Sequence, residues 1–337
     1  NPKNIFNGPA GCGKTTLAVE LARRYQETGK AKDTLFLCFN NLLHRSVEEE
    51  ISLKAPDITF STFHKFLLEQ TKLKPKERDL NDSVFWNEIL PETAMEMHFN
   101  QQLQNFGYLI LDEAQDLFQT NYLDALDLYL EGGFKNSNWN IFGDFSNQDI
   151  FSKGEISIEA FKSKWAQNFS TFKLSINCRN TVDIASYVEG LGRMSPPYRK
   201  TLRQGNEEPN LSLYSDINDE TSKVKKCIGM LLKKGIRTHD IVILHPQKDA
   251  CPVVQSLNED PDFQTKISPY TTNGTGIRHC SIQKFKGLES SAVIIADFDE
   301  LRSSYQVSLF YIGLSRALNY LNIFAHKNLR ETILSHL

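Results

Sequence analysis

Eight consecutive residues near the start of the chain combine three glycines with a lysine and a threonine: Gly8, Pro9, Ala10, Gly11, Cys12, Gly13, Lys14 and Thr15. This phosphate loop fits the pattern G-x-x-x-x-G-K-[ST], between an apolar run at 4–7 and a helical pattern from about 14 to 28. Glycines let backbone N–H groups converge on phosphate oxygens, and the following helix presents its positive N-terminal end to the same anion. A chance glycine turn is the alternative, but the flanking strand and helix favour a nucleoside triphosphate site.

Four side chains could then carry out chemistry on a triphosphate. Lys14 is expected to neutralise the β- and γ-phosphates, and the Thr15 hydroxyl to ligate Mg²⁺. The apolar run 108–111 leads directly into Asp112 and Glu113, which delivers two carboxylates to the ligand-binding edge of a sheet. Asp112 can hold Mg²⁺ through its waters, and Glu113 can orient and deprotonate an attacking water. A solvated acidic helix start is the alternative, which the phosphate loop about 100 residues upstream disfavours.

The elements that position these residues follow from alternating patterns along the chain. Short apolar runs alternate with helical segments, which predicts parallel sheets covered by helices on both faces. The alternation restarts near residue 172, so we predict an α/β fold of two domains, 1–172 and 173–337. Residues 71–105 are expected to form a small helical insertion, and residues 259–275 a long loop. The predicted strands are 4–7, 34–39, 108–111, 139–142, 172–176, 211–214, 241–244, 292–296 and 321–324, with helices at 14–28, 41–52 and 181–191.

The totals exclude several classes of protein. A formal net charge of −3 over 337 residues argues against a strongly basic nucleic-acid binder, so any nucleic-acid contact must be local. The six cysteines are scattered without a C-x-x-C pair, which favours free thiols in a reducing cytoplasm. No apolar run approaches the ~18 residues that span a membrane. Because the chain opens with Asn1, we expect a fragment whose upstream residues are missing.

Residues 112–116, with the phosphate loop upstream, resemble the D-E-A-Q-D motif of superfamily 1 helicases of the UvrD/Rep/PcrA type. Further family motifs occur in the same order along the chain, at 60–64, 143–148, 174–179, 286–289 and 311–317. Seven ordered matches from residue 8 to residue 317 make the resemblance specific. It implies two RecA-like domains and an ATP-dependent translocase or helicase core that acts on a single strand, 3′ to 5′, on DNA more than on RNA.

The resemblance also implies roles for further residues of the nucleotide site. Gln148 would sense the γ-phosphate, while Gly287 and Glu289 belong to the motif whose carboxylate contacts the ribose. Arg179 and Arg316 would reach the phosphates from the second domain as arginine fingers, worth about 10³-fold or more in other NTPases. A surface salt bridge is the alternative for either arginine. ATP would then pull the two domains together, and hydrolysis would release them.

Candidates for contact with a nucleic-acid strand come from the same resemblance. A base could stack on Phe39, worth about 1–3 kcal/mol, although an ordinary core residue at a strand end is the alternative. His64 could instead support the ATP cleft. The implied contact residues are Phe39, Asn40, Asn41, Thr62, His64 and Phe151 in the first domain, with Ser281, Gln283 and Lys284 in the second.

Some positions depart from the family pattern. The tryptophan expected just beyond Phe151 is missing, Cys178 replaces an aromatic residue, and Thr16, counted with the nucleotide site, stands where an arginine is frequent. Insertions are small, as in compact UvrD-like ATPases appended to nucleases. These departures favour a second hypothesis: an ATPase switch that responds to nucleotide or nucleic acid and regulates a fused or partner effector. A GTPase is disfavoured because the chain has no guanine-reading N-K-x-D string.

Overall fold

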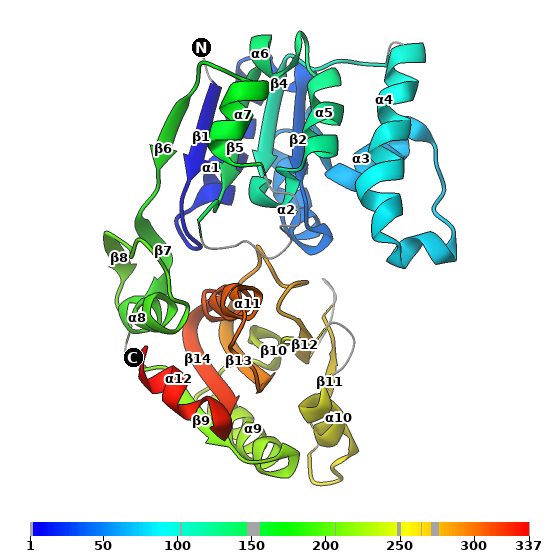
Figure 1. Ribbon diagram of the computed structural model, residues 1–337. Helices are drawn as coiled ribbons and strands as arrows, with labels where there is room; N and C mark the ends of the chain where they lie inside the picture. The colour runs from blue at the N-terminus through cyan, green and yellow to red at the C-terminus, as the bar shows by residue number, and fades with distance from the viewer. Residues whose placement is uncertain are drawn as a thin grey trace. The chain divides into compact units, whose positions relative to one another are not determined.

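The computed structural model describes residues 3–101, 103–146, 156–205, 207–247, 251–263, 265–270 and 276–336 (Figure 1). The chain divides into two compact units, with the change between them after Leu174. The tip of the phosphate loop, Pro9–Gly13, groups with the second unit, and the rest of the chain up to Phe145 with the first. Among the described residues, no helix is long and apolar enough to cross a membrane.

The first unit is built on a six-stranded parallel sheet with the strand order β3-β2-β4-β5-β1-β6. All five residues of β2 are buried, as expected for a strand covered on both faces. The strands are β1 (Lys3–Asn7), β2 (Thr34–Cys38), β3 (Thr59–Thr62), β4 (Tyr108–Asp112), β5 (Asn138–Gly143) and β6 (Ser170–Lys173). β3 was not predicted, because its short sequence T-F-S-T has no apolar run.

Helices cover both faces of this sheet. Apolar residues of α1 and α2 pack with Phe36, Ile110 and Phe142 on one face. Those of α3 to α7 pack with Leu37, Leu111 and related residues on the other. The α-helices are α1 (Lys14–Glu27), α2 (Asn41–Lys54), α3 (Phe63–Thr71), α4 (Leu90–Gln101), α5 (Thr120–Leu128), α6 (Gly133–Asn136) and α7 (Ile158–Lys164). Short 3₁₀ helices are η1 (Ala31–Asp33), η2 (Glu77–Asn81) and η4 (Ala114–Leu117), and η3 (Phe85–Ile89) is a π-helical turn.

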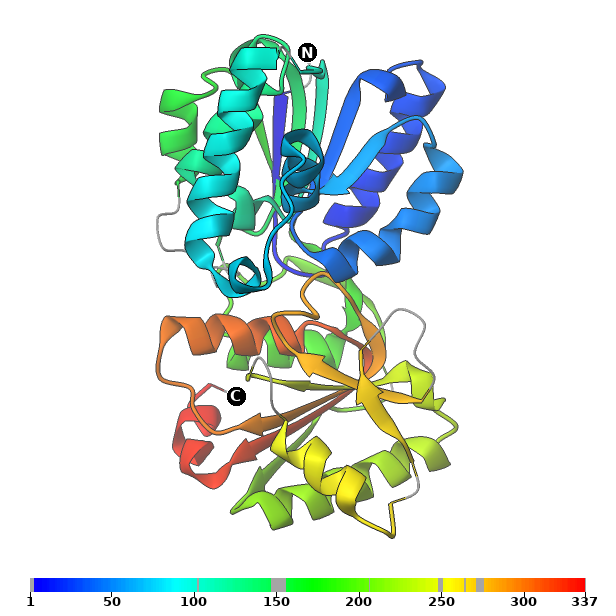
Figure 2. The ribbon, with the colours of Figure 1, turned by 90° about the vertical axis from the view of Figure 1, so that its right-hand side faces the viewer.

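The second unit repeats the pattern with a six-stranded parallel sheet in the order β11-β12-β10-β13-β14-β9. Its strands are β9 (Asn210–Tyr214), β10 (Ile241–His245), β11 (Ile267–Pro269), β12 (Ile277–Ser281), β13 (Ser290–Phe298) and β14 (Ala317–His326). A separate parallel pair joins β7 (Ile176–Thr181) to β8 (Lys200–Arg203). Figure 2 shows α11 (Ser304–Leu314) on one face of the six-stranded sheet, and α9 (Ile217–Lys233) and α10 (Pro252–Glu259) on the other.

The remaining helices of the second unit are α8 (Val182–Leu191), α12 (Arg330–Leu334) and the 3₁₀ turns η5 (Thr238–Asp240) and η6 (Lys327–Leu329). The prediction of an α/β fold with parallel sheets flanked by helices is confirmed.

Two local predictions are wrong. The single strand at 172–176 is two strands, β6 and β7, which are interrupted at Leu174 and Ser175, and the long loop at 259–275 contains β11.

Candidate active site

The carboxyl ends of five strands of the first unit line up at one edge of its sheet. Asn7 at the end of β1 pairs with Gly143 at the end of β5. Cys38 at the end of β2 pairs with both Asp112 and Thr62. Because the phosphate loop follows β1 and Glu113 follows β4, this register delivers the predicted triphosphate and catalytic residues to the same edge.

Two glycines permit the conformation of the phosphate loop. A Cβ atom at Gly8 would lie 2.6 Å from the backbone oxygen of Leu174, so only glycine fits there. Gly13 has φ +77°, in the left-handed region that glycine adopts without strain. Lys14 begins α1 and is buried, and its ammonium donates a hydrogen bond of 2.7 Å to the Gly8 carbonyl. The positive charge is therefore held at the loop itself. Of the other predicted nucleotide-site residues here, Ala10, Gly11 and Cys12 are buried, Pro9 and Thr15 are half-buried, and Thr16 is exposed.

Thr15 and Asp112, the two predicted magnesium ligands, lie in contact. The Asp112 carboxylate accepts a hydrogen bond from the Thr15 hydroxyl, and the side chain is only 1% exposed. Burial, assisted by the neighbouring Glu113, raises the pKa of Asp112 to about 7. Its Oδ1 has no hydrogen-bond partner among the described residues. A buried carboxylate oxygen without a partner, beside a hydroxyl, fits a divalent cation with oxygen ligands.

A chain of hydrogen bonds holds the predicted general base. Gln115 Nε2 donates to Glu113 Oε2 at 2.6 Å, and Gln115 Oε1 accepts from the Asp144 backbone at 3.0 Å. Glu113 itself has φ +51°, a conformation that costs a non-glycine residue about 1–3 kcal/mol and is typical of functional sites. Our sequence analysis missed Gln115, although it lies inside the D-E-A-Q-D string. Gln148 and Phe151 lie outside the described residues.

In the second unit, both predicted arginine fingers meet the segment 287–289. Arg179 on β7 donates from Nε to Glu289 Oε2 at 2.7 Å, with the arginine side chain 17% and the glutamate 48% exposed. Arg316 is 1% exposed, and its Nη1 donates to the Leu288 carbonyl at 3.3 Å. Arg316 also donates to Ile312 O and Ser315 Oγ. The structure thus brings Arg179 and Glu289 together and buries Arg316 beneath the same segment.

Asn180 is a further residue that our sequence analysis missed. It is fully buried, and its Nδ2 donates to the carbonyls of Ser315 and Ala317 at 3.2 and 2.7 Å. It therefore ties the strand that carries Arg179 to the segment that carries Arg316. Asparagine next to the arginine in the L-S-I-N-C-R-N string was the available signal.

The predicted strand-contact residues of the first unit lie at the ends of β2 and β3. Phe39 is half-buried and packs edge-on against the His64 ring at 5.4 Å. His64 Nε2 lies 3.0 Å from the Tyr122 hydroxyl, and burial lowers the pKa of His64 to about 4. Asn40 and Thr62 cap α2 and α3 by accepting hydrogen bonds from Leu42 N and Lys65 N, and Asn41 is exposed. The caps give these two polar residues a structural role of their own.

The candidates of the second unit follow β12. Ser281 is buried, and its hydroxyl accepts a hydrogen bond of 3.4 Å from Lys284 N. Gln283 is half-buried and donates to the Tyr305 hydroxyl at 3.0 Å, whereas the Lys284 side chain is exposed. Gln283 and Lys284 are therefore more accessible to a strand than Ser281.

Comparison with known proteins gives one family match. Residues 2–131, well under half of the chain, match a family model described as an AAA domain. No curated protein matches the chain. One similar solved structure is the C-terminal domain of a possible DNA helicase from Lactobacillus plantarum: it is 20% identical, the match covers 44% of this chain and 87% of that one, and the TM-score is 0.36.

A second similar structure is the Arterivirus nonstructural protein 10, a helicase. It is 12% identical, the match covers 99% of this chain and 62% of that one, and the TM-score is 0.43. These two likenesses are too weak to argue from. The family match covers the phosphate loop, Asp112 and Glu113, and it supports nucleotide binding by an ATP-binding domain in this part of the chain.

Proposed function

We propose that this chain is the core of an ATP-dependent translocase or helicase that hydrolyses ATP and moves on a single nucleic-acid strand. The contact between Thr15 and Asp112 is the observation that carries the proposal. It places a buried carboxylate with an unpartnered oxygen next to the hydroxyl that follows the phosphate-loop lysine. Together with Glu113, these residues suit the binding and hydrolysis of a triphosphate.

In the proposed reaction, the loop amides and Lys14 bind the β- and γ-phosphates. Thr15 and Asp112 would hold Mg²⁺, which supplies charge neutralisation when bound. Glu113, oriented by Gln115, positions a water whose oxygen attacks the γ-phosphorus and whose proton passes to the carboxylate. The bond from the γ-phosphorus to the bridging oxygen breaks, and ADP leaves with the electron pair. Preorganisation of Glu113 by a hydrogen bond of 2.6 Å supports this role.

The arginines and the nucleotide sensor complete the proposal. Arg179 and Arg316 would stabilise charge on the transferring phosphoryl group, Gln148 would sense the γ-phosphate, and Glu289 would contact the ribose. Binding of one ATP by both units would favour closure, and hydrolysis would release it. The position of both arginines against the segment 287–289 supports a shared response to nucleotide.

We propose that the single nucleic-acid strand binds at the other end of the sheet edge that carries the phosphate loop, beside Phe39 and His64. The register that aligns Cys38, Thr62 and Asp112 supports this placement, because Phe39 then lies one strand, and His64 two strands, from the strand that carries Asp112. Single-stranded DNA with 3′ to 5′ movement is the proposed substrate and direction.

A second candidate function is an ATPase switch that regulates a fused or partner effector without processive unwinding. Small insertions favour it. Between β3 and β4 the described residues add only α3, two short turns and α4, and between β7 and β12 they add little beyond the elements of the sheet. A duplex-unwinding assay beside a translocation assay separates the two candidates, because a switch hydrolyses ATP without separating strands.

The test of the proposal is the rate of ATP hydrolysis by the purified chain with Mg²⁺, alone and with single-stranded DNA or RNA. We expect a stimulated rate with one of the two strands, and loss of that rate in Lys14→Ala. The matched control is Lys32→Ala, at an exposed lysine of η1. Hydrolysis that neither strand stimulates would refute the translocase, and a normal rate in Lys14→Ala would refute the site.

A further inference from the structure

Three side chains that commonly bind metal ions meet in the second unit. His245 ends β10, His279 lies on the neighbouring β12, and Cys251 is the residue before α10. His279 pairs with Ile243, which lies two residues before His245, so both histidines lie on the same face of the sheet. That face is the one covered by α9 and α10, and the start of α10 brings Cys251 to it. The topology therefore gathers residues that are far apart in sequence.

The distances within this His–Cys cluster are short. One ligand atom from each of the three residues lies within 4.8 Å of the other two. His279 Nδ1 and His245 Nε2 are 3.5 Å apart. Ligand atoms around a tetrahedral zinc ion, about 2.0–2.3 Å from the metal, are roughly 3.3–3.8 Å apart. Closing the cluster on an ion therefore requires side-chain movements of about an ångström.

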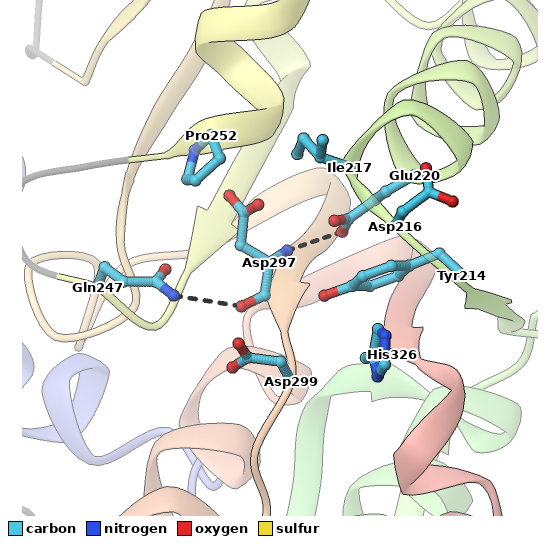
Figure 3. A pocket seen from close by; sticks show the side chains of 9 residues that line it. All are labelled: Tyr214, Asp216, Ile217, Glu220, Gln247, Pro252, Asp297, Asp299 and His326. Atoms are coloured by element: carbon cyan, nitrogen blue, oxygen red, sulfur yellow. Dashed lines mark hydrogen bonds between the residues drawn. The ribbon is translucent and has the colours of Figure 1, made fainter.

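Asp297 on β13 contacts one member of the cluster. The Cys251 thiol donates to Asp297 Oδ2 at 3.1 Å. Asp297 has φ +53°, and hydrogen bonds hold its backbone on both sides, from N to Glu220 Oε1 at 2.8 Å and from Gln247 Nε2 to O at 3.4 Å (Figure 3). A non-glycine residue held in the left-handed region is typical of binding sites.

His245 is the most deeply buried histidine of the cluster. It is 2% exposed, and its Nδ1 has no hydrogen bond of good geometry among the described residues. Leaving a buried polar atom unsatisfied costs about 1–3 kcal/mol. A set of polar side chains that merely hydrogen-bond to one another is the alternative, and metal titration distinguishes the two.

We propose that His245, Cys251 and His279 bind a divalent transition-metal ion of the zinc type. Nitrogen and sulfur donors select zinc over magnesium or calcium, which prefer oxygen. When the ion binds, the Cys251 thiol loses its proton to solvent and the thiolate sulfur coordinates the metal. This site is separate from the predicted magnesium site and uses none of its residues.

A pocket lies beside the cluster and shares none of its three residues. It has a volume of about 270 Å³, and Asp297 lines it together with Gln247 and Pro252, the neighbours of His245 and Cys251. Figure 3 shows the carboxylates of Asp216, Glu220, Asp297 and Asp299 around it, with Tyr214 and His326 at the side opposite Gln247.

The proposed ion would join two strands of the sheet, β10 and β12, and the start of α10. His279 lies two residues before Ser281, where the segment 281–289 begins with its strand-contact and nucleotide candidates. Because metal ligation fixes the end of β12 to β10, the ion would stabilise the base of this segment. The proposed metal site does not depend on whether the chain moves on nucleic acid.

The experiment is a cobalt titration of the purified full chain, without an added histidine tag and after chelator treatment. We expect one Co²⁺ per chain, thiolate-to-cobalt charge-transfer absorption, and displacement by Zn²⁺. Cys251→Ser should abolish the charge-transfer absorption, and His279→Ala should weaken binding at least 10-fold. Matched controls are Cys227→Ser, at a buried cysteine of α9, and His239→Ala, at an exposed histidine of η5.

Controls that bind as the wild type does, with both ligand variants impaired and folded by circular dichroism, support the site. Wild-type protein without stoichiometric binding or without charge-transfer absorption overturns the proposal, even if the variants do not fold. Equal affinity in Cys251→Ser and the wild type also overturns it.

Discussion

Arg179 and Glu289 form an ion pair of 2.7 Å in which the residue proposed to stabilise phosphate charge is bound to the residue proposed to contact the ribose. The glutamate is 48% exposed, and such a pair contributes at most about 1 kcal/mol. A triphosphate offers the guanidinium a much larger charge. Arg179 and Glu289 can therefore separate and contact a nucleotide instead, without a large loss of folding stability.

Replacing Arg179 tests this exchange. Arg179→Ala is expected to lower kcat for ATP hydrolysis about 10³-fold, because the transferring phosphoryl group loses a guanidinium. The free energy of unfolding, measured by denaturant titration, should change by less than about 1 kcal/mol. Arg199→Ala, at an exposed arginine of the same unit, is the matched control and should retain the wild-type rate. If Arg179→Ala hydrolyses ATP at the wild-type rate, Arg179 has only the role of a salt-bridge partner.

Replacing Gln115 tests how Glu113 is oriented. Gln115→Ala removes the hydrogen bonds to Glu113 Oε2 and from Asp144 N, so kcat should fall about 10-fold or more while KM for ATP changes little. Gln115→Glu should not restore the rate, because a carboxylate cannot donate to Glu113. Gln104→Ala, at an exposed glutamine, is the control. An unchanged kcat in Gln115→Ala would show that Glu113 needs no such support.

Replacing Phe39 tests the proposed strand contact. Loss of one stacking partner costs about 1–3 kcal/mol per base, so Phe39→Ala should weaken binding of a single strand roughly 5- to 150-fold. Fluorescence anisotropy with a labelled oligonucleotide measures this at a fixed salt concentration. Phe99→Ala, at a phenylalanine of α4 that is 73% exposed, is the control. Equal binding by Phe39→Ala and the control would leave Phe39 as a packing residue.

Acid should destabilise the first unit through His64. Burial lowers the pKa of His64 to about 4, whereas an unfolded histidine titrates near 6.5. Between these values the unfolded chain binds the proton and the folded one does not, so stability is complete above pH 6.5 and falls toward pH 4. Because the ring keeps partial exposure, we expect a loss of about 2 kcal/mol.

The measurement is the unfolding free energy of the wild type and of His64→Gln at pH 7 and pH 4.5. The variant should lose less stability than the wild type on acidification, and His239→Gln should behave as the wild type. Parallel losses in the wild type and His64→Gln would contradict the assignment.

The fold was predictable where apolar runs are uninterrupted. β2, β4, β10 and β13 contain such runs, because strands covered on both faces are mainly apolar. The sequence T-F-S-T of β3 and I-R-H-C-S of β12 mixes polar residues into short strands, so only pairing with their neighbours identifies them. Residues 174 and 175 interrupt a pattern that reads as one strand.

Some residues of the candidate site were predictable from the sequence and others were not. The phosphate loop, Asp112 and Glu113 lie in local strings whose residue types and spacing are enough to indicate their chemistry. Gln115 and Asn180 act through contacts that depend on distant backbone atoms, Asp144 N and Ala317 O. His245 and His279 are separated by more than thirty residues and match no metal-binding spacing, so only the sheet brings them together.

The central claim is that Glu113 deprotonates the water that attacks ATP bound at the phosphate loop. The rate of ATP hydrolysis by Glu113→Gln, with saturating ATP, Mg²⁺ and single-stranded DNA, tests it most directly, beside the wild type and Glu131→Gln at an exposed glutamate. We predict a rate at least about 10²-fold below the wild type in Glu113→Gln, with ATP still bound, and a wild-type rate in Glu131→Gln. A wild-type rate in Glu113→Gln would contradict the account.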